Sequence, residues 1–224
     1  MRNIKIAPGE HYHVFNRGVG KQIIFHDKID YTRFLFLVLH FQSSVTFSQI
    51  GRLSKKFLHD VQHSVLDREV EQDIIKNRSV ELVGFCLMPN HFHLIVKELD
   101  EGGIAMYMQR ILNAYTKYYN TKYQKSGHLF QGPYKAVHIE DDKQLLYLSA
   151  YIHRNPRELK GWSGKEKEYP WSSCEDFIKE NRFGKLLVTD IVLEQFKNTK
   201  EYQRFLDTSP AKMLEDELVE VTLE

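Results

Sequence analysis

The sequence has little cysteine and no long apolar segment. Two cysteines occur in 224 residues, Cys86 and Cys174, and they lie too far apart for the paired spacing of a zinc site. A disulfide framework is therefore not expected, and a reducing compartment such as the cytoplasm fits. No apolar run approaches the ~20 residues that span a bilayer, so no membrane association is expected. The N-terminus also lacks the apolar segment of a secretory signal.

Net charge is nearly absent as well. There are 31 basic and 30 acidic side chains, which gives a formal charge of +1, and 42% of the residues are hydrophobic. These proportions are typical of a soluble globular protein. The small sum does not exclude a nucleic-acid partner, because binding depends on where charge is concentrated. Residues 104–135 carry five Lys or Arg side chains and no Asp or Glu.

The hydrophobic pattern predicts an α+β domain. Alternating and β-rich runs predict strands, and apolar residues repeated every three or four positions predict helices. The first six elements are a strand at 11–17, a helix at 28–42, two strands within 80–97, a helix at 104–120 and a strand at 134–140. This βαββαβ order is that of a ferredoxin-like fold, whose antiparallel sheet carries helices on one face. A further helix follows from Asp141 to Pro156, and residues 45–79 predict a helical insertion.

His91 and His93 flank Phe92 in a predicted strand. Because strand side chains alternate, both imidazoles lie on one face and Phe92 points to the core. Two neutral imidazoles on one face can reach a single divalent metal ion. The alternative is a pair that only decorates a polar strand face. Eleven histidines make such spacing common, and His11 and His13 form another pair.

In the helix that follows Asp141, Tyr147, Tyr151 and Asn155 recur every four positions and share one face. In isolation, such a tyrosine is usually a core residue, and an asparagine before proline usually marks a helix end. Together with a His-X-His strand, a phenol one turn from an amide oxygen suits nucleophilic attack on a phosphodiester beside a metal ion. Tyr115 is a rival nucleophile. It is the weaker candidate, because Tyr119 follows it four residues later and supplies no amide or carboxylate.

The segment 104–135 mixes basic and aromatic side chains. Basic groups neutralise phosphates, and aromatic rings stack on unpaired bases. The alternative is a core helix with solvated lysines, so we expect the binding surface to lie mainly in the loop at 122–135. The side chains expected to contact DNA are Arg17, Arg110, Lys117, Lys122, Lys125, His128, Lys135 and Arg154.

Several separated strings resemble one family in the same order. MPNHFHLIVK resembles the HUH motif (His, hydrophobic residue, His) of single-tyrosine transposases, and YIHRNP resembles their tyrosine helix. HVFNRGV and GHLFQGPYKAVHIEDDKQLLYLSAYIHRNPREL extend the resemblance. Across residues 8–162 the sequence most resembles the REP-associated tyrosine transposases of the single-tyrosine HUH superfamily.

This resemblance implies a ferredoxin-like HUH nuclease domain at 8–162, with the helical insertion at 45–79. A peripheral, mainly helical extension is expected at 163–224. The resemblance implies an enzyme that binds single-stranded DNA with repetitive palindromic hairpins and cuts it through a covalent 5′-phosphotyrosine. Such enzymes then rejoin the strands, using Mg²⁺ or Mn²⁺.

By position in the motifs, Tyr151 matches the nucleophile, and His91 and His93 match metal ligands. Asn155 matches the third metal ligand, where some relatives carry Gln. REP-associated members can act as monomers and insertion-sequence relatives are dimers, so a monomer and a homodimer both stay open. The alternative function is a non-catalytic ferredoxin-like module that binds RNA or structured DNA by stacking.

The C-terminal residues 205–224 carry six acidic side chains against Lys212. If this tail folds over the basic surface, truncation at about residue 205 is expected to tighten DNA binding at low salt.

Overall fold

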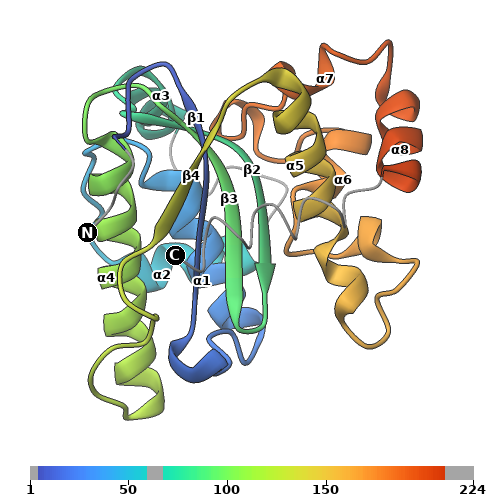
Figure 1. The fold of residues 1–224 in the computed structure, drawn as a ribbon. Helices are drawn as coiled ribbons and strands as arrows, with labels where there is room; N and C mark the ends of the chain where they lie inside the picture. Colours follow the sequence, from blue (N-terminus) through green and yellow to red (C-terminus); the bar gives the residue numbers. More distant parts are fainter. Residues whose placement is uncertain (1–4, 60–67, 210–224) are drawn as a thin grey trace.

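A computed structural model describes residues 5–59 and 68–209 (Figure 1). At its centre lies a four-stranded antiparallel sheet of order β2-β3-β1-β4, formed by β1 (His11–Arg17), β2 (Val80–Met88), β3 (His91–Glu98) and β4 (Lys135–Ile139). Helix α1 (Lys28–His40) lies between β1 and β2 in the chain, and α4 (Gly103–Tyr123) lies between β3 and β4. The predicted α+β class and the ferredoxin-like βαββαβ order are therefore confirmed.

Local side-chain chemistry sets where these elements begin and end. Helix α1 begins after Asp27, whose carboxylate accepts hydrogen bonds from the backbone N–H groups of Ile29 and Asp30. Helix α5 (Asp142–Arg154) begins in the same way, because Asp141 accepts from the backbone N–H of Gln144. It ends before Pro156, which cannot continue the helical hydrogen bonds.

The predicted insertion forms two helices, α2 (Ile50–His59) and α3 (Arg68–Lys76). Phe57 and Ile74 are buried in the same apolar core as α1. The insertion therefore extends that core, and its part at 60–67 lies outside the described residues. Short 3-10 helices occur at Val19–Lys21, Asn155–Glu158, Glu166–Glu168 and Gly184–Leu186.

The sheet separates two apolar cores. One face packs against α1 and α4, and the other packs against α5 (Figure 1). Leu145, Leu148 and Ile152 of α5 are buried on that second face, as their helical spacing predicts. Gly84 of β2 allows the close approach, because a Cβ atom there would lie 3.3 Å from Cδ1 of Ile152. The tyrosine-bearing helix is thus seated directly on the sheet.

The segment after residue 162 is not the peripheral extension expected from the sequence. Its helices α6 (Cys174–Ile178), α7 (Asp190–Leu193) and α8 (Thr199–Thr208) contribute to the second core. Phe177 and Tyr202 are fully buried there, because the apolar face of α5 needs a cover away from the sheet. Truncation at residue 205 would remove the buried Leu206 as well as the tail. The acidic tail itself, residues 210–224, lies outside the described residues.

His40, at the end of α1, is buried among aromatic rings. Its Nδ1–H donates to the Phe36 carbonyl over 2.7 Å, and its ring stacks on that of Phe36. Burial lowers the pKa of His40 to about 4, although the hydrogen bond to Phe36 acts in the opposite direction. The unfolded chain therefore binds a proton here below about pH 6.5, whereas the folded chain binds it only near pH 4.

Folding is consequently expected to weaken as the pH falls from 6.5 towards 4. In His40→Gln, the free energy of unfolding should depend less steeply on pH over this interval, by up to about 1.4 kcal/mol per pH unit. Urea denaturation of both proteins at several pH values measures the two slopes. Equal slopes would show that His40 does not carry this pH dependence.

Candidate active site

His91 and His93 project from β3 on the sheet face that α5 covers. Their ring centroids lie 5.0 Å apart, with planes at 87°. Phe92, between them, is fully buried in the core of the opposite face. His93 is 7% exposed and His91 is half-buried. The alternation expected from the sequence is therefore present, and both imidazoles lie on one face.

Burial lowers the pKa of both imidazoles. For His91, a hydrogen bond with the Asn155 side chain opposes this lowering of the pKa, and the positive charge of Arg17 adds to it. For His93, the neighbouring His91 and His13 add to the lowering of the pKa. Both rings are therefore neutral at neutral pH, which is the form that binds a metal ion.

Each of the two rings has its Nδ1 atom engaged. Nδ1 of His91 lies 2.7 Å from Oδ1 of Asn90, whose Nδ2 donates to the Lys21 carbonyl, so the amide oxygen accepts from the imidazole. Nδ1 of His93 lies 2.8 Å from Nε2 of His13. With Nδ1 engaged in both rings, a metal ion would bind each ring through Nε2.

Helix α5 places Tyr151 and Asn155 over the two histidines. The Tyr151 ring lies 5.6 Å from the His93 ring, at 82° between planes. Asn155, at the end of α5, forms a side-chain hydrogen bond with His91. Nδ2 of Asn155 donates to the Tyr151 carbonyl over 3.1 Å, and a cation between Asn155 and His91 would be bound by the amide oxygen in place of their mutual hydrogen bond. The fold thus brings together the four residues expected to form the nucleophile and metal site.

The rival tyrosine lies elsewhere. Tyr115 is fully buried in the core of the opposite sheet face, where its hydroxyl donates to the Ile24 carbonyl over 2.6 Å. Burial raises the pKa of Tyr115 well above its usual value. Tyr147, one turn before Tyr151, packs against Phe205 at 5.5 Å between ring centroids. Of these three tyrosines, Tyr151 is the one beside the histidines.

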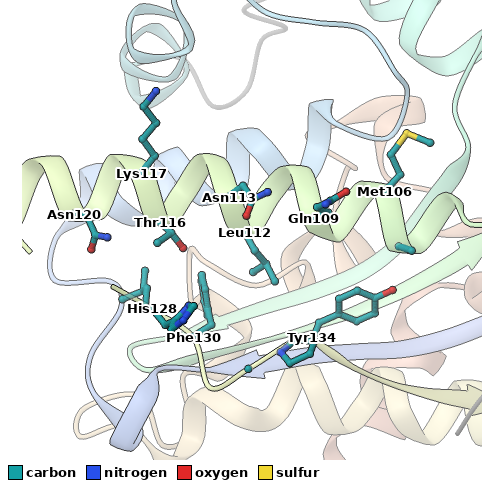
Figure 2. A pocket seen from close by; sticks show the side chains of 14 residues that line it. Met106, Gln109, Leu112, Asn113, Thr116, Lys117, Asn120, His128, Phe130 and Tyr134 are labelled. Atoms are coloured by element: carbon teal, nitrogen blue, oxygen red, sulfur yellow. The ribbon is translucent and has the colours of Figure 1, made fainter. Parts of the chain in front are cut away.

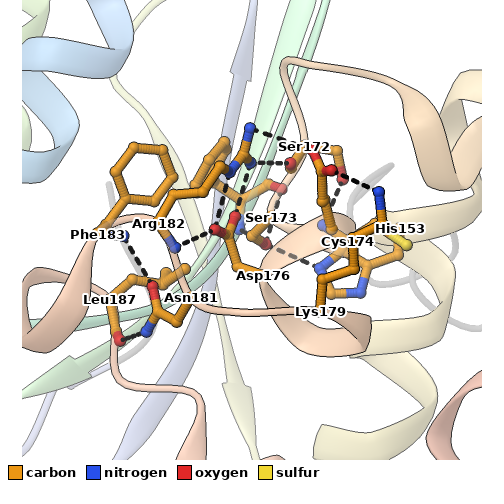
Figure 3. A network of polar contacts seen from close by, with 12 residues as sticks. His153, Ser172, Ser173, Cys174, Asp176, Lys179, Asn181, Arg182, Phe183 and Leu187 are labelled. Atoms are coloured by element: carbon orange, nitrogen blue, oxygen red, sulfur yellow. Dashed lines mark hydrogen bonds and ion pairs between the residues drawn. The ribbon is translucent and has the colours of Figure 1, made fainter. Parts of the chain in front are cut away.

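His153, a buried histidine on α5, links the helix to neighbouring elements by hydrogen bonds. Nε2 of His153 lies 2.8 Å from Oγ of Ser173 (Figure 3). Nδ1 of His153 lies 2.7 Å from the hydroxyl of Tyr202. The Ser173 hydroxyl also accepts from the backbone N–H of Phe85 in β2 over 2.9 Å. This chain of hydrogen bonds ties α5 to the sheet, to the start of α6 and to α8.

His153→Ala is therefore expected to lower the free energy of unfolding by about 3 kcal/mol. The substitution leaves a cavity and removes a hydrogen-bond partner from both Ser173 and Tyr202. Chemical denaturation at pH 7 measures the change. His138→Ala removes a half-exposed histidine that is paired with Glu10 and should cost less than about 1 kcal/mol. A similar small loss for His153→Ala would contradict the anchoring role.

Two of the arginines expected to contact DNA are held within the protein. Arg110 donates to the carbonyl oxygens of Ser43 and Val45 and lies over the Phe41 ring. Arg154 donates to the Ser209 carbonyl. Both guanidinium groups therefore fasten segments of this chain to one another.

Lys122 is held in the same way. Its ammonium lies 2.8 Å from a carboxylate oxygen of Asp27 and 2.6 Å from one of Asp30. Burial lowers the pKa of Lys122, but hydrogen bonds to these carboxylates more than offset it, so the pKa is raised. Asp30 also accepts from the hydroxyls of Tyr118 and Tyr123, each over 2.7 Å. The lysine thus neutralises a buried carboxylate and joins α4 to α1.

A groove of about 1020 Å³ lies between α4 and the segment 128–134 (Figure 2). Lys117 and His128, both expected to contact DNA, line it. Polar side chains at positions that share one helical stripe also line it, namely Gln109, Asn113, Thr116 and Asn120. These four are not among the residues expected from the sequence, although their spacing along one face is a signal that could have found them.

Arg17 and Lys135 lie on strands β1 and β4, next to the strand that carries the histidines or one strand further. Arg17 stands opposite His91 in the pairing of β1 with β3, and its Nε donates to Gln131 over 2.5 Å. Lys135 stands opposite Phe15 in the pairing of β1 with β4, on the sheet face that carries the histidines. Lys125 is exposed just beyond the end of α4.

Within residues 5–59 and 68–209, no group of three or more His, Cys, Asp or Glu side chains is placed to hold a metal ion. A metal at His91 and His93 would therefore draw on the Asn155 amide oxygen and on non-protein oxygens. Among the described helices, none is long and apolar enough to cross a membrane.

Two comparisons found similarity to transposases. The family described as "Transposase IS200 like" matches residues 53–155, a range that includes both histidines, Tyr151 and Asn155. A solved structure of a REP-associated tyrosine transposase bound to a REP hairpin matches with a TM-score of 0.51 and 12% identity, over 85% of this chain and 92% of that chain. No curated protein matches the sequence. The chain is therefore similar to the IS200-like transposases over residues 53–155 and shares the fold of a REP-associated tyrosine transposase.

Proposed function

We propose that this chain is a metal-dependent DNA transposase that cleaves hairpin-bearing single-stranded DNA with Tyr151 as nucleophile. The observation that carries the proposal is the placement of Tyr151 and Asn155 against His91 and His93 on one sheet face. The REP hairpin bound to the structurally similar transposase supports hairpin DNA as the partner. All four residues come from one chain, so a monomer would hold a complete site.

The residues present fit a divalent cation such as Mg²⁺ or Mn²⁺. Nε2 of His91, Nε2 of His93 and the amide oxygen of Asn155 would hold it, with further positions left for water or phosphate oxygens. When bound, such an ion polarises a phosphodiester and offsets its negative charge. Burial keeps both imidazoles neutral, so they would bind it without first losing a proton.

Tyr151 would supply the covalent chemistry. Its hydroxyl oxygen attacks the phosphorus of the scissile phosphodiester, forming a Tyr–O–P bond as the bond from phosphorus to the 3′ oxygen breaks. The proton lost by the phenol balances the proton gained by the released 3′ hydroxyl. A later 3′ hydroxyl attacks the phosphotyrosine in the reverse sense, which rejoins the strand and restores the tyrosine.

The groove beside α4, together with the side chains of Arg17 and Lys135, would hold the DNA strand. Lys117 and Arg17 offer charge to phosphates, and the amide side chains along α4 offer hydrogen bonds to base edges. The charge of Arg17 already acts on His91, so a phosphate that it neutralises would lie beside the metal site.

Lys117→Ala is expected to weaken binding of a hairpin-bearing single strand. Loss of one phosphate contact should reduce the slope of log K against log salt by about 0.7. Fluorescence anisotropy at several salt concentrations measures both affinity and slope. The matched control is Lys200→Ala, an exposed lysine on α8, across the sheet from α4 (Figure 1). If both variants kept the wild-type slope, the groove would not be a phosphate-binding surface.

A non-catalytic module that stacks bases on its sheet is the less supported function. Such a module needs aromatic side chains on an open sheet face. In the described residues, α5 covers the face with the histidines, and α1 with α4 covers the other. Incubation with Mn²⁺ and a labelled hairpin strand, followed by a denaturing gel, separates the two functions. A protein band that carries label is expected, and Mn²⁺-independent binding without such a band would favour the module.

A further inference from the structure

His13 contacts the candidate metal site from the neighbouring strand. It lies on β1 and is 2% exposed. Its ring stacks on that of His93, at 5.1 Å between centroids and 17° between planes. The Phe15 ring also lies against the His13 ring, at 4.7 Å between centroids. The imidazole of His13 is therefore enclosed, and the 2.8 Å contact between its Nε2 and Nδ1 of His93 is held in place by packing.

The proton in this contact decides which atom of His93 can bind a metal ion. A hydrogen bond between two imidazole nitrogens has one donor and one acceptor. If Nδ1 of His93 carries the proton, Nε2 of His93 keeps its lone pair and can be a ligand. If Nε2 of His13 carries it, a neutral His93 has its proton on Nε2, and that atom cannot bind a metal. The enclosed His13 ring, with its Nε2 atom 2.8 Å from Nδ1 of His93, is placed to accept that proton.

We propose that His13 is a positioning residue that accepts the Nδ1–H of His93 and so commits Nε2 of His93 to the metal ion. This inference rests on the proposed function, because it assumes a metal at His93. The contact with His93 is the hydrogen bond that the buried His13 ring makes in the described structure. A neutral His13 that accepts at Nε2 carries its own proton on Nδ1, which is buried without a hydrogen-bond partner, so this tautomer has a free-energy cost that the bond to His93 and the metal ion must offset. Asn90 makes the equivalent contact to His91.

Titration of the DNA-free, full-length protein with Mn²⁺, followed by electron paramagnetic resonance of the free ion, tests this role. His13→Phe keeps a ring but offers no acceptor, and it is expected to weaken Mn²⁺ binding by about 10- to 100-fold. His13→Gln offers an amide oxygen and is expected to restore most of that affinity. His11→Gln changes the histidine two residues earlier on the same face of β1, and it should bind Mn²⁺ as the wild type does.

Nitrogen-15 NMR of the histidine rings gives a readout that does not depend on affinity. In the wild type, His93 is expected to carry its proton on Nδ1, and His13→Phe should shift it towards Nε2. Thermal unfolding of each variant confirms that it is folded. Wild-type Mn²⁺ affinity in folded His13→Phe, or an equal loss in His13→Gln, would overturn this inference and leave the proposed function intact. Absence of Mn²⁺ binding by the wild type would overturn both.

Discussion

Tyr151→Phe is expected to abolish the covalent protein–DNA adduct and to slow strand cleavage by about 10³-fold or more. The substitution removes one oxygen atom and keeps the ring that packs against His93. Tyr151 is half-buried at the edge of the second core, so loss of its hydroxyl should leave folding unchanged. A lost adduct would then report on chemistry alone.

Tyr147→Phe is the matched control for this substitution. Tyr147 lies one turn earlier on the same helix and packs against Phe205, away from the histidines. Cleavage of a labelled hairpin strand in Mn²⁺, measured as adduct on a denaturing gel and as rate of product formation, compares the two variants. An adduct of full intensity in Tyr151→Phe would remove Tyr151 from the role of nucleophile.

His91→Ala is expected to slow cleavage by about 10²-fold or more while the protein stays folded. His91 is half-buried and lies outside the apolar cores, so the free energy of unfolding should fall by about 1 kcal/mol at most. His93→Ala should also abolish cleavage. It should cost more stability, because it leaves His13 buried without its hydrogen-bond partner.

Three measurements separate loss of metal from loss of fold in these variants: Mn²⁺ affinity, urea denaturation and cleavage rate. His138→Ala, a half-exposed histidine on β4, should change none of them greatly. Removal of divalent cations from the wild type with a chelator should reproduce the loss seen in His91→Ala. Full-rate cleavage by His91→Ala, or by the wild type in chelator, would contradict a metal held by this histidine pair.

The part of the site that could be predicted from sequence follows local periodicity. His91 and His93 share a face because strand side chains alternate, and Tyr151 and Asn155 share a face because a helix repeats every 3.6 residues. Neither period depends on the rest of the fold. The family resemblance implied that these two faces meet. The packing of Ile152 against Gly84 gives their meeting a physical basis.

The remaining contacts depend on long-range packing, which no local pattern reports. Lys122 could be counted as a basic surface residue, but its carboxylate partners stand at 27 and 30 in another helix. The C-terminal segment was predicted to be helical and peripheral, yet Phe177 and Tyr202 complete the core that packs against α5. The contact of His13 with His93 depends on the register of β1 against β3, in which His13 stands opposite Ile95.

The central claim is that Tyr151 becomes joined to DNA through a 5′ phosphate, and mass spectrometry of the trapped adduct tests it most directly. After digestion with nuclease and protease, the peptide that contains Tyr151 is expected to carry a nucleotide linked through its 5′ phosphate. Fragmentation should place that mass on the tyrosine oxygen. A nucleotide on any other residue, or one linked through its 3′ phosphate, would contradict the account.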